Sequence, residues 1–271
     1  MDRGDSRRRI VSPAGVADVS GGWPATIACV CRFGFTFSVR PPPVPPVPTR
    51  RPPPPLSDPE AASEIRVLYE DAAMLVLRKP AGLLSVPGRG EDRADCVASR
   101  IQARYPDARV VHRLDMATSG LMVFGLGLDA QRALGRAFET RRVDKRYEAV
   151  VAGHLLPELG HVDLPLICDW PNRPRQMVDH ERGKPASTHW HVLTHEPTGA
   201  HTRVALHPIT GRSHQLRVHL WSLGHPILGD ELYGDNASRC AASRLLLHAS
   251  GLGLPHPMTG EWLSFEDPTP F

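Results

Sequence analysis

The segment Val111-His-Arg-Leu-Asp-Met-Ala-Thr-Ser-Gly120 decides how the rest of the chain is interpreted. The flanking residues 110–114 and 121–126 predict two strands, and the polar residues 115–120 predict a loop between them. Arg113 and Asp115 are two positions apart, so they share a face while the chain is extended. A carboxylate that ends a strand close to arginines is ionised at neutral pH and can act as a nucleophile or a base. A structural ion pair is the alternative that this segment alone leaves open.

A second segment, Ile209-Thr-Gly-Arg-Ser-His-Gln-Leu-Arg-Val-His-Leu220, predicts a loop followed by a helix over residues 213–223. Gly211 permits an unusual backbone angle before this helix, and Gly224 ends it. Leu216, Leu220 and Leu223 are spaced i, i+4 and i+7, which predicts an apolar face toward the core.

The polar side chains of this second segment allow more than one role. Arg212 and Arg217 could bind phosphate or pair with a buried carboxylate. His214 and His219 suggest a metal site, but a five-residue spacing places them well apart around a helix, so a shared ion is not expected. Helix capping and surface positions are the expected roles of these two histidines.

The densest basic run after the N-terminal region is Arg141-Arg-Val-Asp-Lys-Arg-Tyr147. A solvated helix end is the ordinary interpretation of such a run. Tyr147 at its end could pack in the core, or it could stack on a base, since an aromatic ring beside basic residues is typical of nucleic-acid sites.

Strand patterns recur along the rest of the chain and outnumber helical ones. Further strands are expected at residues 65–69, 74–77, 146–152, 188–193, 201–206, 245–249 and 262–265, and a further helix from Asp129, its expected cap, to residue 140. Hairpin connections dominate, one of them around Pro197-Thr198-Gly199. The fold class indicated is α+β, with a mixed, mostly antiparallel central sheet and flanking helices.

Composition excludes several classes of protein. The 271-residue chain has no apolar stretch approaching the ~20 residues needed to span a bilayer, so no membrane association is expected. Its five cysteines are scattered without a Cys-x-x-Cys pair, which argues against a zinc site or a disulfide scaffold and favours a reducing cytoplasm. Walker, Gly-x-Gly-x-x-Gly and Gly-x-Ser-x-Gly motifs are absent from the sequence, so nucleotide-driven chemistry and serine hydrolysis have no support.

The first 57 residues differ from the rest. They contain eight arginines and three aspartates, a net charge of +5, so residues 58–271 carry −2 of the overall +3. Any RNA site must therefore be a local basic patch. Residues 41–55 contain ten prolines, which predicts a disordered extension. A proline-rich ligand for a partner, or a translation start further downstream, are the alternatives.

Several motifs in sequence order resemble the RluA family of pseudouridine synthases. The resemblance begins with His112-Arg-Leu-Asp115 and Thr118-Ser-Gly120 and covers about residues 64–271. Its other motifs are Lys79-Pro-Ala-Gly82, Lys145-Arg-Tyr147, Gly183-Lys-Pro-Ala186, Thr210-Gly-Arg-Ser-His-Gln-Leu-Arg217, Gly224-His-Pro-Ile-Leu-Gly-Asp230 and Leu245-Leu-Leu-His248.

The resemblance implies a pseudouridine synthase fold with a central RNA-binding cleft, formed by residues 58–271 without the S4 domain of many relatives. It implies that Asp115 is the nucleophile, that Arg217 pairs with Asp115, and that Tyr147 packs on the uracil and is a candidate base for C5. Arg113 would help to hold a nucleotide flipped out of its stack. The remaining residues expected to contact RNA are His112, Arg212, His214 and Gln215. No cofactor or metal is required, and a monomer without an obligatory protein partner is expected.

Two stretches, Leu84-Ser-Val-Pro-Gly-Arg89 and Pro165-Leu-Ile-Cys-Asp-Trp-Pro-Asn-Arg173, resemble the dual-specificity branch of that family. The implied substrates are a 23S rRNA hairpin loop and the first nucleotide of certain tRNA anticodon loops. Two rival functions remain: an N-glycoside hydrolase, for which no clear second carboxylate is visible, and a non-catalytic RNA-binding module, which would not need Asp115.

Overall fold

The computed structural model describes residues 64–88, 90 and 93–271. The predicted extension, residues 1–57, lies outside these residues, so the division of the chain at residue 57 stays a prediction. The strands are β1 (Arg66–Glu70), β2 (Met74–Lys79), β3 (Ala108–Val110), β4 (Ser119–Leu126), β5 (Asp144–Ala152), β6 (Leu159–Asp163), β7 (Leu166–Cys168), β8 (Gln176–Val178), β9 (Ser187–His195), β10 (His201–Pro208), β11 (Leu247–Pro255) and β12 (Trp262–Glu266). The helices are α1 (Val97–Arg104), α2 (Leu128–Glu139), α3 (Gln215–Ser222) and α4 (Asn236–Cys240), with a 3₁₀ turn at Trp170–Asn172.

One sheet dominates the described part of the chain. Its strand order is β1-β2-β4-β11-β5-β10-β9-β6, with β12 paired to β11 and β3 to β4. Neighbouring strands run antiparallel except β4 and β11, which run parallel. The α+β class and the mostly antiparallel sheet predicted from the sequence are confirmed. The predicted hairpin at residues 197–199 is the β9–β10 connection.

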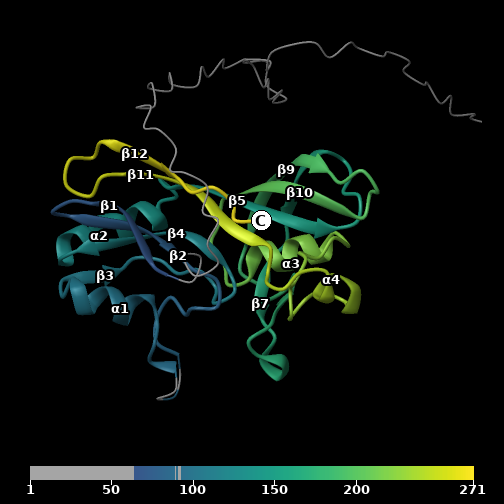
Figure 1. The fold of residues 1–271 in the computed structure, drawn as a ribbon, viewed down its shortest axis with the longest axis horizontal. Coiled ribbons are helices and arrows are strands. Elements are labelled where there is room, and N and C mark those ends of the chain that lie inside the picture. The colour runs from purple at the N-terminus through teal and green to yellow at the C-terminus, as the bar shows by residue number, and fades with distance from the viewer. Residues whose placement is uncertain (1–63, 89, 91–92) are drawn as a thin grey trace, which may run out of the picture. The chain divides into compact units, whose positions relative to one another are not determined.

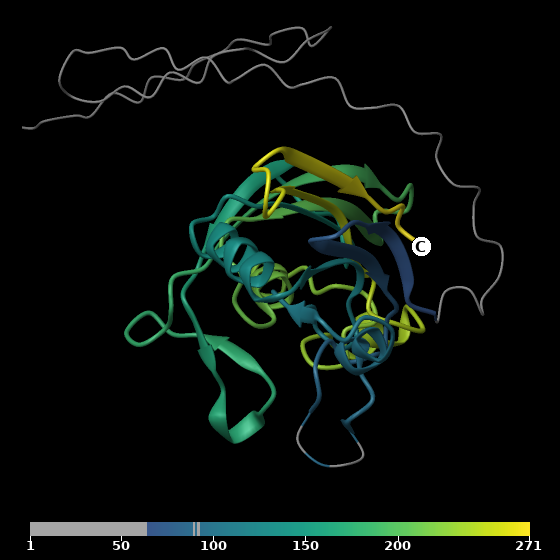
Figure 2. The same ribbon diagram turned by 90° about the vertical axis from the view of Figure 1, so that its left-hand side faces the viewer.

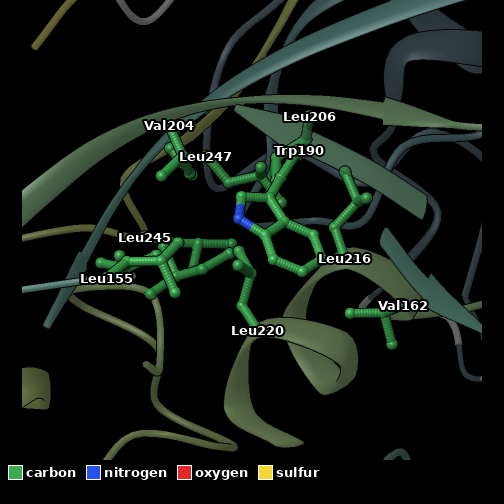
Figure 3. Close-up of a cluster of buried hydrophobic side chains, with 12 residues drawn as sticks. Leu155, Val162, Trp190, Val204, Leu206, Leu216, Leu220, Leu245 and Leu247 are labelled. Carbon is green, nitrogen blue, oxygen red and sulfur yellow. The ribbon is translucent and has the colours of Figure 1, made fainter. Parts of the chain in front are cut away.

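Strands β2 and β4 are buried on both faces, and this explains their continuous apolar sequences. Leu75 and Leu77 pack with α1, whereas Met74 and Val76 pack with α2. The other half of the sheet, β5, β10 and β9, packs against α3. Figure 3 shows this cluster, in which Leu216 and Leu220 of α3 face Trp190, Val204 and Leu206. Leu216 and Leu220 therefore fix α3 to the sheet as their spacing predicts, whereas Leu223, the third leucine of the predicted face, is exposed at the end of the helix.

Two expected elements have different limits. The strand expected at residues 110–114 ends at Val110, because the chain then leaves β4. The side chain of His112 bonds β4 at this point instead of a strand backbone: its Nε2 accepts from the amide of Val123 at 3.1 Å. Helix α2 begins after Gly127, and Asp129 lies inside its first turn instead of capping it.

The second segment also departs from its expected backbone. Helix α3 begins at Gln215, and its N-cap His214 has a φ of 54°. The residue with the left-handed backbone conformation is thus His214, whereas Gly211 has no positive φ. Gly224, with a φ of 84°, follows the end of the helix as predicted.

Several features were not predicted: helix α1, strand β6, the β7–β8 hairpin with its 3₁₀ turn, and the short helix α4. The β7–β8 hairpin extends away from the main sheet (Figures 1 and 2) and has three-residue strands. Strands of three residues give too few alternations to be read from a sequence. In the described part of the chain, no helix is both long and apolar enough to cross a membrane.

Candidate active site

The loop between β3 and β4 carries Asp115 and is held by residues 79–85. Lys79 is fully buried, and its Nζ donates to the carbonyls of Pro80, Leu83 and Met116 at 2.7, 2.7 and 3.0 Å. The Ser85 hydroxyl donates to the Leu114 carbonyl at 2.6 Å. These bonds fix the residues on both sides of Asp115, so the carboxylate projects from a rigid loop.

Lys79 adds a charge below this loop. Burial lowers its pKa to about 7, while the nearby Asp115 carboxylate favours the charged form. Three carbonyl acceptors use all three hydrogens of an ammonium, so the geometry fits the charged lysine.

Gly120 lets β11 approach β4 directly behind the loop. Its φ is 115°, and it pairs with Ala249 of the parallel strand β11. An added Cβ would lie 2.5 Å from the backbone nitrogen of Ala249, closer than atoms can approach. Any other residue would therefore displace the strand that supports the site.

Arg217 projects from α3 toward Asp115, and a second carboxylate orients it. Arg217 is buried, and its Nη1 lies 3.6 Å from Asp115 Oδ2. Its Nε and Nη2 donate to the two oxygens of buried Asp230 at 2.8 and 2.7 Å. Asp230 also accepts from the amides of Leu232 and Tyr233 at 2.9 and 3.1 Å. The main partner of Arg217 is therefore Asp230, and the pair predicted with Asp115 is its longer, secondary contact.

Asp115 itself is accessible. Its side chain is 28% exposed, against 5% for Arg217 and 1% for Asp230. The site thus contains one reachable carboxylate beside a buried, oriented cation. Asp230 ends the motif at residues 224–230, but no sequence pattern indicated its contact with Arg217.

Tyr147 lies in β5 and is half-buried. Burial and the Asp115 charge together raise its pKa well above the usual range of a phenol. The Tyr147 hydroxyl is therefore protonated at neutral pH. Tyr147 contacts two of the hydrophobic clusters, including that of α3.

The basic run 141–147 does not form one surface. Arg141 and Arg142 are exposed, as a solvated helix end predicts. Lys145, in contrast, is half-buried, and its Nζ donates to the carbonyl of Thr210 at 3.1 Å. Burial lowers the pKa of Lys145 to about 8. This lysine supports the loop before α3.

Two residues expected to contact RNA are used by the fold instead. Gln215 is buried, and its amide bonds Thr210, the Arg212 nitrogen, Ser187 and Thr188 at 2.7 to 3.0 Å. It therefore shapes the 210–212 loop. His112 stacks on Phe138 with ring centroids 4.7 Å apart, and burial lowers its pKa to about 4. We assign structural roles to both.

The other expected contacts remain reachable. Arg113 and Arg212 are exposed. His214 is half-buried, with its Nε2 4.0 Å from Asp115 Oδ2. His219, expected at the surface, is buried and bonds Thr188 and the Leu164 carbonyl at 3.0 and 3.1 Å.

Neither of two concave surfaces on the molecule contains Asp115. One lies along β1, and the other lies between α2 and residues 255–260. The predicted RNA-binding cleft therefore stays a prediction. Among residues 64–88, 90 and 93–271, no group of three or more His, Cys, Asp or Glu side chains is placed to hold a metal ion.

Residues 73–222, which include Asp115, Tyr147 and Arg217, match the family model described as RNA pseudouridylate synthase. The chain belongs to the RNA pseudouridylate synthase family. It is 54% identical over 205 residues to the dual-specificity RNA pseudouridine synthase RluA of Escherichia coli (strain K12), covering 76% of this chain and 93% of that protein. It is 52% identical over 200 residues to the protein of that name from Yersinia pestis, covering 74% and 97%.

A solved structure supports the same family. Human RNA Pseudouridylate Synthase Domain Containing 1 superposes with a TM-score of 0.66 at 30% identity, covering 79% of this chain and 87% of that one. The pseudouridine synthase fold and the family resemblance predicted from the sequence are thus confirmed. The chain is an RNA pseudouridine synthase, an isomerase of uridine in RNA.

Proposed function

We propose that Asp115 is the nucleophile of this isomerisation and that the enzyme has dual specificity. The proposed targets are a 23S rRNA hairpin loop and the first nucleotide of certain tRNA anticodon loops, in the cytoplasm. The observation that carries the proposal is the position of Asp115, a partly exposed carboxylate 3.6 Å from a buried arginine that Asp230 holds. The dual specificity is supported by relatives that are 54% identical and are named dual-specificity RNA pseudouridine synthases.

The reaction rearranges bonds without net gain or loss of atoms. The C1′–N1 bond of uridine breaks, the base turns, and a C1′–C5 bond forms. C5 then loses its proton and N1 gains one. Asp115 attacks either C1′ of the ribose or C6 of the uracil, and the covalent intermediate holds the fragments in place. The target must leave its stack to reach Asp115, at a cost of a few kcal/mol.

Tyr147 is suited to act after Asp115. The Asp115 charge is one of the two causes that raise the Tyr147 pKa. Nucleophilic attack turns the carboxylate into a neutral ester and removes that charge. While that ester persists, the pKa of Tyr147 falls and its phenolate forms more readily. The phenolate, not the phenol, is the form that can accept the C5 proton.

RNA affinity is assigned to the exposed arginines around Asp115. Arg113 and Arg212 are free to meet phosphates, and Arg212 is anchored only by an Nε bond to the Pro185 carbonyl at 3.1 Å. Phosphate contacts supply most sequence-independent affinity. We assign the base-specific contacts to the flipped uridine.

The N-glycoside hydrolase alternative gains no support from the second carboxylate. A hydrolase pair needs a carboxylic acid that can transfer a proton. Asp230 is 1% exposed and accepts four hydrogen bonds from Arg217, Leu232 and Tyr233. It is a fixed counter-ion for Arg217.

RNA labelled with tritium at C5 of uridine tests the proposal. Total tRNA and 23S rRNA fragments are incubated separately with the enzyme. The proposal predicts tritium release to water from both, with no free uracil. Release from one class alone would contradict dual specificity, and free uracil would indicate hydrolysis.

A further inference from the structure

His214 lies between Asp115 and Tyr233, with one ring nitrogen toward each, and Tyr233 in turn bonds the β7–β8 hairpin. Its Nδ1 lies 2.8 Å from the hydroxyl oxygen of Tyr233. Its Nε2 lies 4.0 Å from Asp115 Oδ2. Catalytic contacts of this kind are often long without substrate and shorten in the complex.

The hydrogen bonds around Tyr233 determine which ring nitrogen carries the proton. The amide of Gln176, in β8, donates to the Tyr233 hydroxyl oxygen at 2.7 Å. A backbone amide can only donate, so the Tyr233 hydroxyl keeps its own proton available for the His214 Nδ1, and we assign the bond in that direction. Burial raises the pKa of Tyr233 to about 12, so this proton is present at neutral pH. Nδ1 is then the acceptor, and the neutral ring carries its hydrogen on Nε2, facing Asp115.

The backbone at His214 shows that this placement has a cost. His214 is the N-cap of α3, with a φ of 54° and no side-chain capping bond. Asparagine and glycine adopt this left-handed conformation more readily. A strained residue whose side chain is aimed at a reactive carboxylate is typical of a functional position.

Both neighbours of Asp115 approach the same oxygen. Arg217 Nη1 and His214 Nε2 lie 3.6 and 4.0 Å from Oδ2. Both contacts are longer than a hydrogen bond, and if they shorten in the complex, as catalytic contacts often do, two donors on Oδ2 would orient the carboxylate and leave Oδ1 free for the substrate.

We propose that His214 is a positioning residue that, with Arg217, holds Asp115 Oδ2 so that Oδ1 performs the attack, and that Tyr233 fixes the ring tautomer required. The inference rests on the proposed role of Asp115. It also links the β7–β8 hairpin to the site, because the chain of hydrogen bonds starts at Gln176.

Two amide variants separate the two ring nitrogens. The amide of His214→Gln reaches the Nε2 position and can still donate to Asp115. The amide of His214→Asn reaches only the Nδ1 position, so it loses that donor while tolerating the left-handed backbone. Single-turnover rates are measured at saturating RNA, with RNA affinity and melting temperature measured in parallel.

His214→Asn should slow the rate roughly 10- to 100-fold, the worth of a hydrogen bond to a charged group, with unchanged affinity and an equal or higher melting temperature. His214→Gln should be closer to wild type in rate, although less stable. A wild-type rate for His214→Asn, or equal loss in both variants, would overturn the proposal. Turnover by Asp115→Asn would instead overturn the proposed function.

The tautomer of His214 can be measured directly by NMR. Nitrogen-15 chemical shifts of His214 should show a protonated Nε2 and an unprotonated Nδ1. In Tyr233→Phe, which leaves the imidazole in place, we expect a mixture of tautomers and a rate between those of wild type and His214→Asn. A protonated Nδ1 in the wild-type enzyme would overturn the assignment.

Discussion

Replacing Asp230 with asparagine tests whether the ion pair behind Asp115 orients Arg217. Asp230 accepts two bonds from Arg217 and two from backbone amides, and it is 1% exposed. An amide keeps one acceptor oxygen and leaves the buried guanidinium without a counter-ion behind it. Breaking a buried pair costs about 3 kcal/mol or more. For a domain of this size that corresponds to a melting temperature about 6–12 °C lower.

The chain contains a matched control with the same geometry at the surface. Arg100 donates Nε and Nη2 to the two oxygens of Asp95, both at 2.7 Å. The side chains of Arg100 and Asp95 are 48% and 62% exposed. Asp95→Asn should leave the melting temperature nearly unchanged, because exposed ion pairs contribute little.

Activity is compared at a temperature where both variants are folded. Differential scanning calorimetry gives the stabilities, and single-turnover tritium release at saturating RNA gives the rates. Asp230→Asn should be slower by about tenfold or more, because Arg217 no longer points at Asp115 with a fixed geometry. Equal melting temperatures for the two variants would refute the argument from burial. A wild-type rate in a destabilised Asp230→Asn would refute the orienting role.

Three further predictions concern other parts of the chain. Burial lowers the pKa of His112 to about 4, so the unfolded state binds more protons between pH 4 and 6.5, and stability rises with pH across that window by up to about 3 kcal/mol. His112→Gln, which can still accept from Val123, should flatten this part of a melting-temperature profile, and an unchanged slope would contradict the prediction. A chain that begins at Glu60 should fold and keep full activity at moderate salt, and a large loss of either would reveal a role for the extension. Tyr147→Phe should bind RNA normally but release tritium about 100-fold more slowly or worse, and near-normal release would exclude Tyr147 as the C5 base.

The sequence predicted local features well where one periodic pattern decided them. Helix α3 and the β9–β10 hairpin follow from leucine spacing and from a turn flanked by alternating residues. Asp115 was predicted from its place at the end of an expected strand, beside an arginine and within a family motif. These signals lie within about ten residues of each other.

Features that depend on contacts between distant segments were missed or misassigned. Asp230 and Arg217 are 13 residues apart on different elements, and their bond shows no periodicity. Gln215 was expected to contact RNA because it lies in a motif of the family resemblance, yet it is 3% exposed. Which polar side chain is buried depends on the packing of α3 against the sheet, and local sequence patterns do not show that packing.

Asp115→Asn tests the central claim most directly, because it changes the carboxylate to an amide of nearly the same size. Tritium release from labelled RNA is measured with the pure, folded variant at saturating concentration, and RNA affinity is measured in the same buffer. The account predicts no detectable isomerisation, with affinity within about tenfold of wild type, since phosphate contacts supply most of the binding. Substantial turnover by Asp115→Asn would contradict the assignment of Asp115 as the nucleophile.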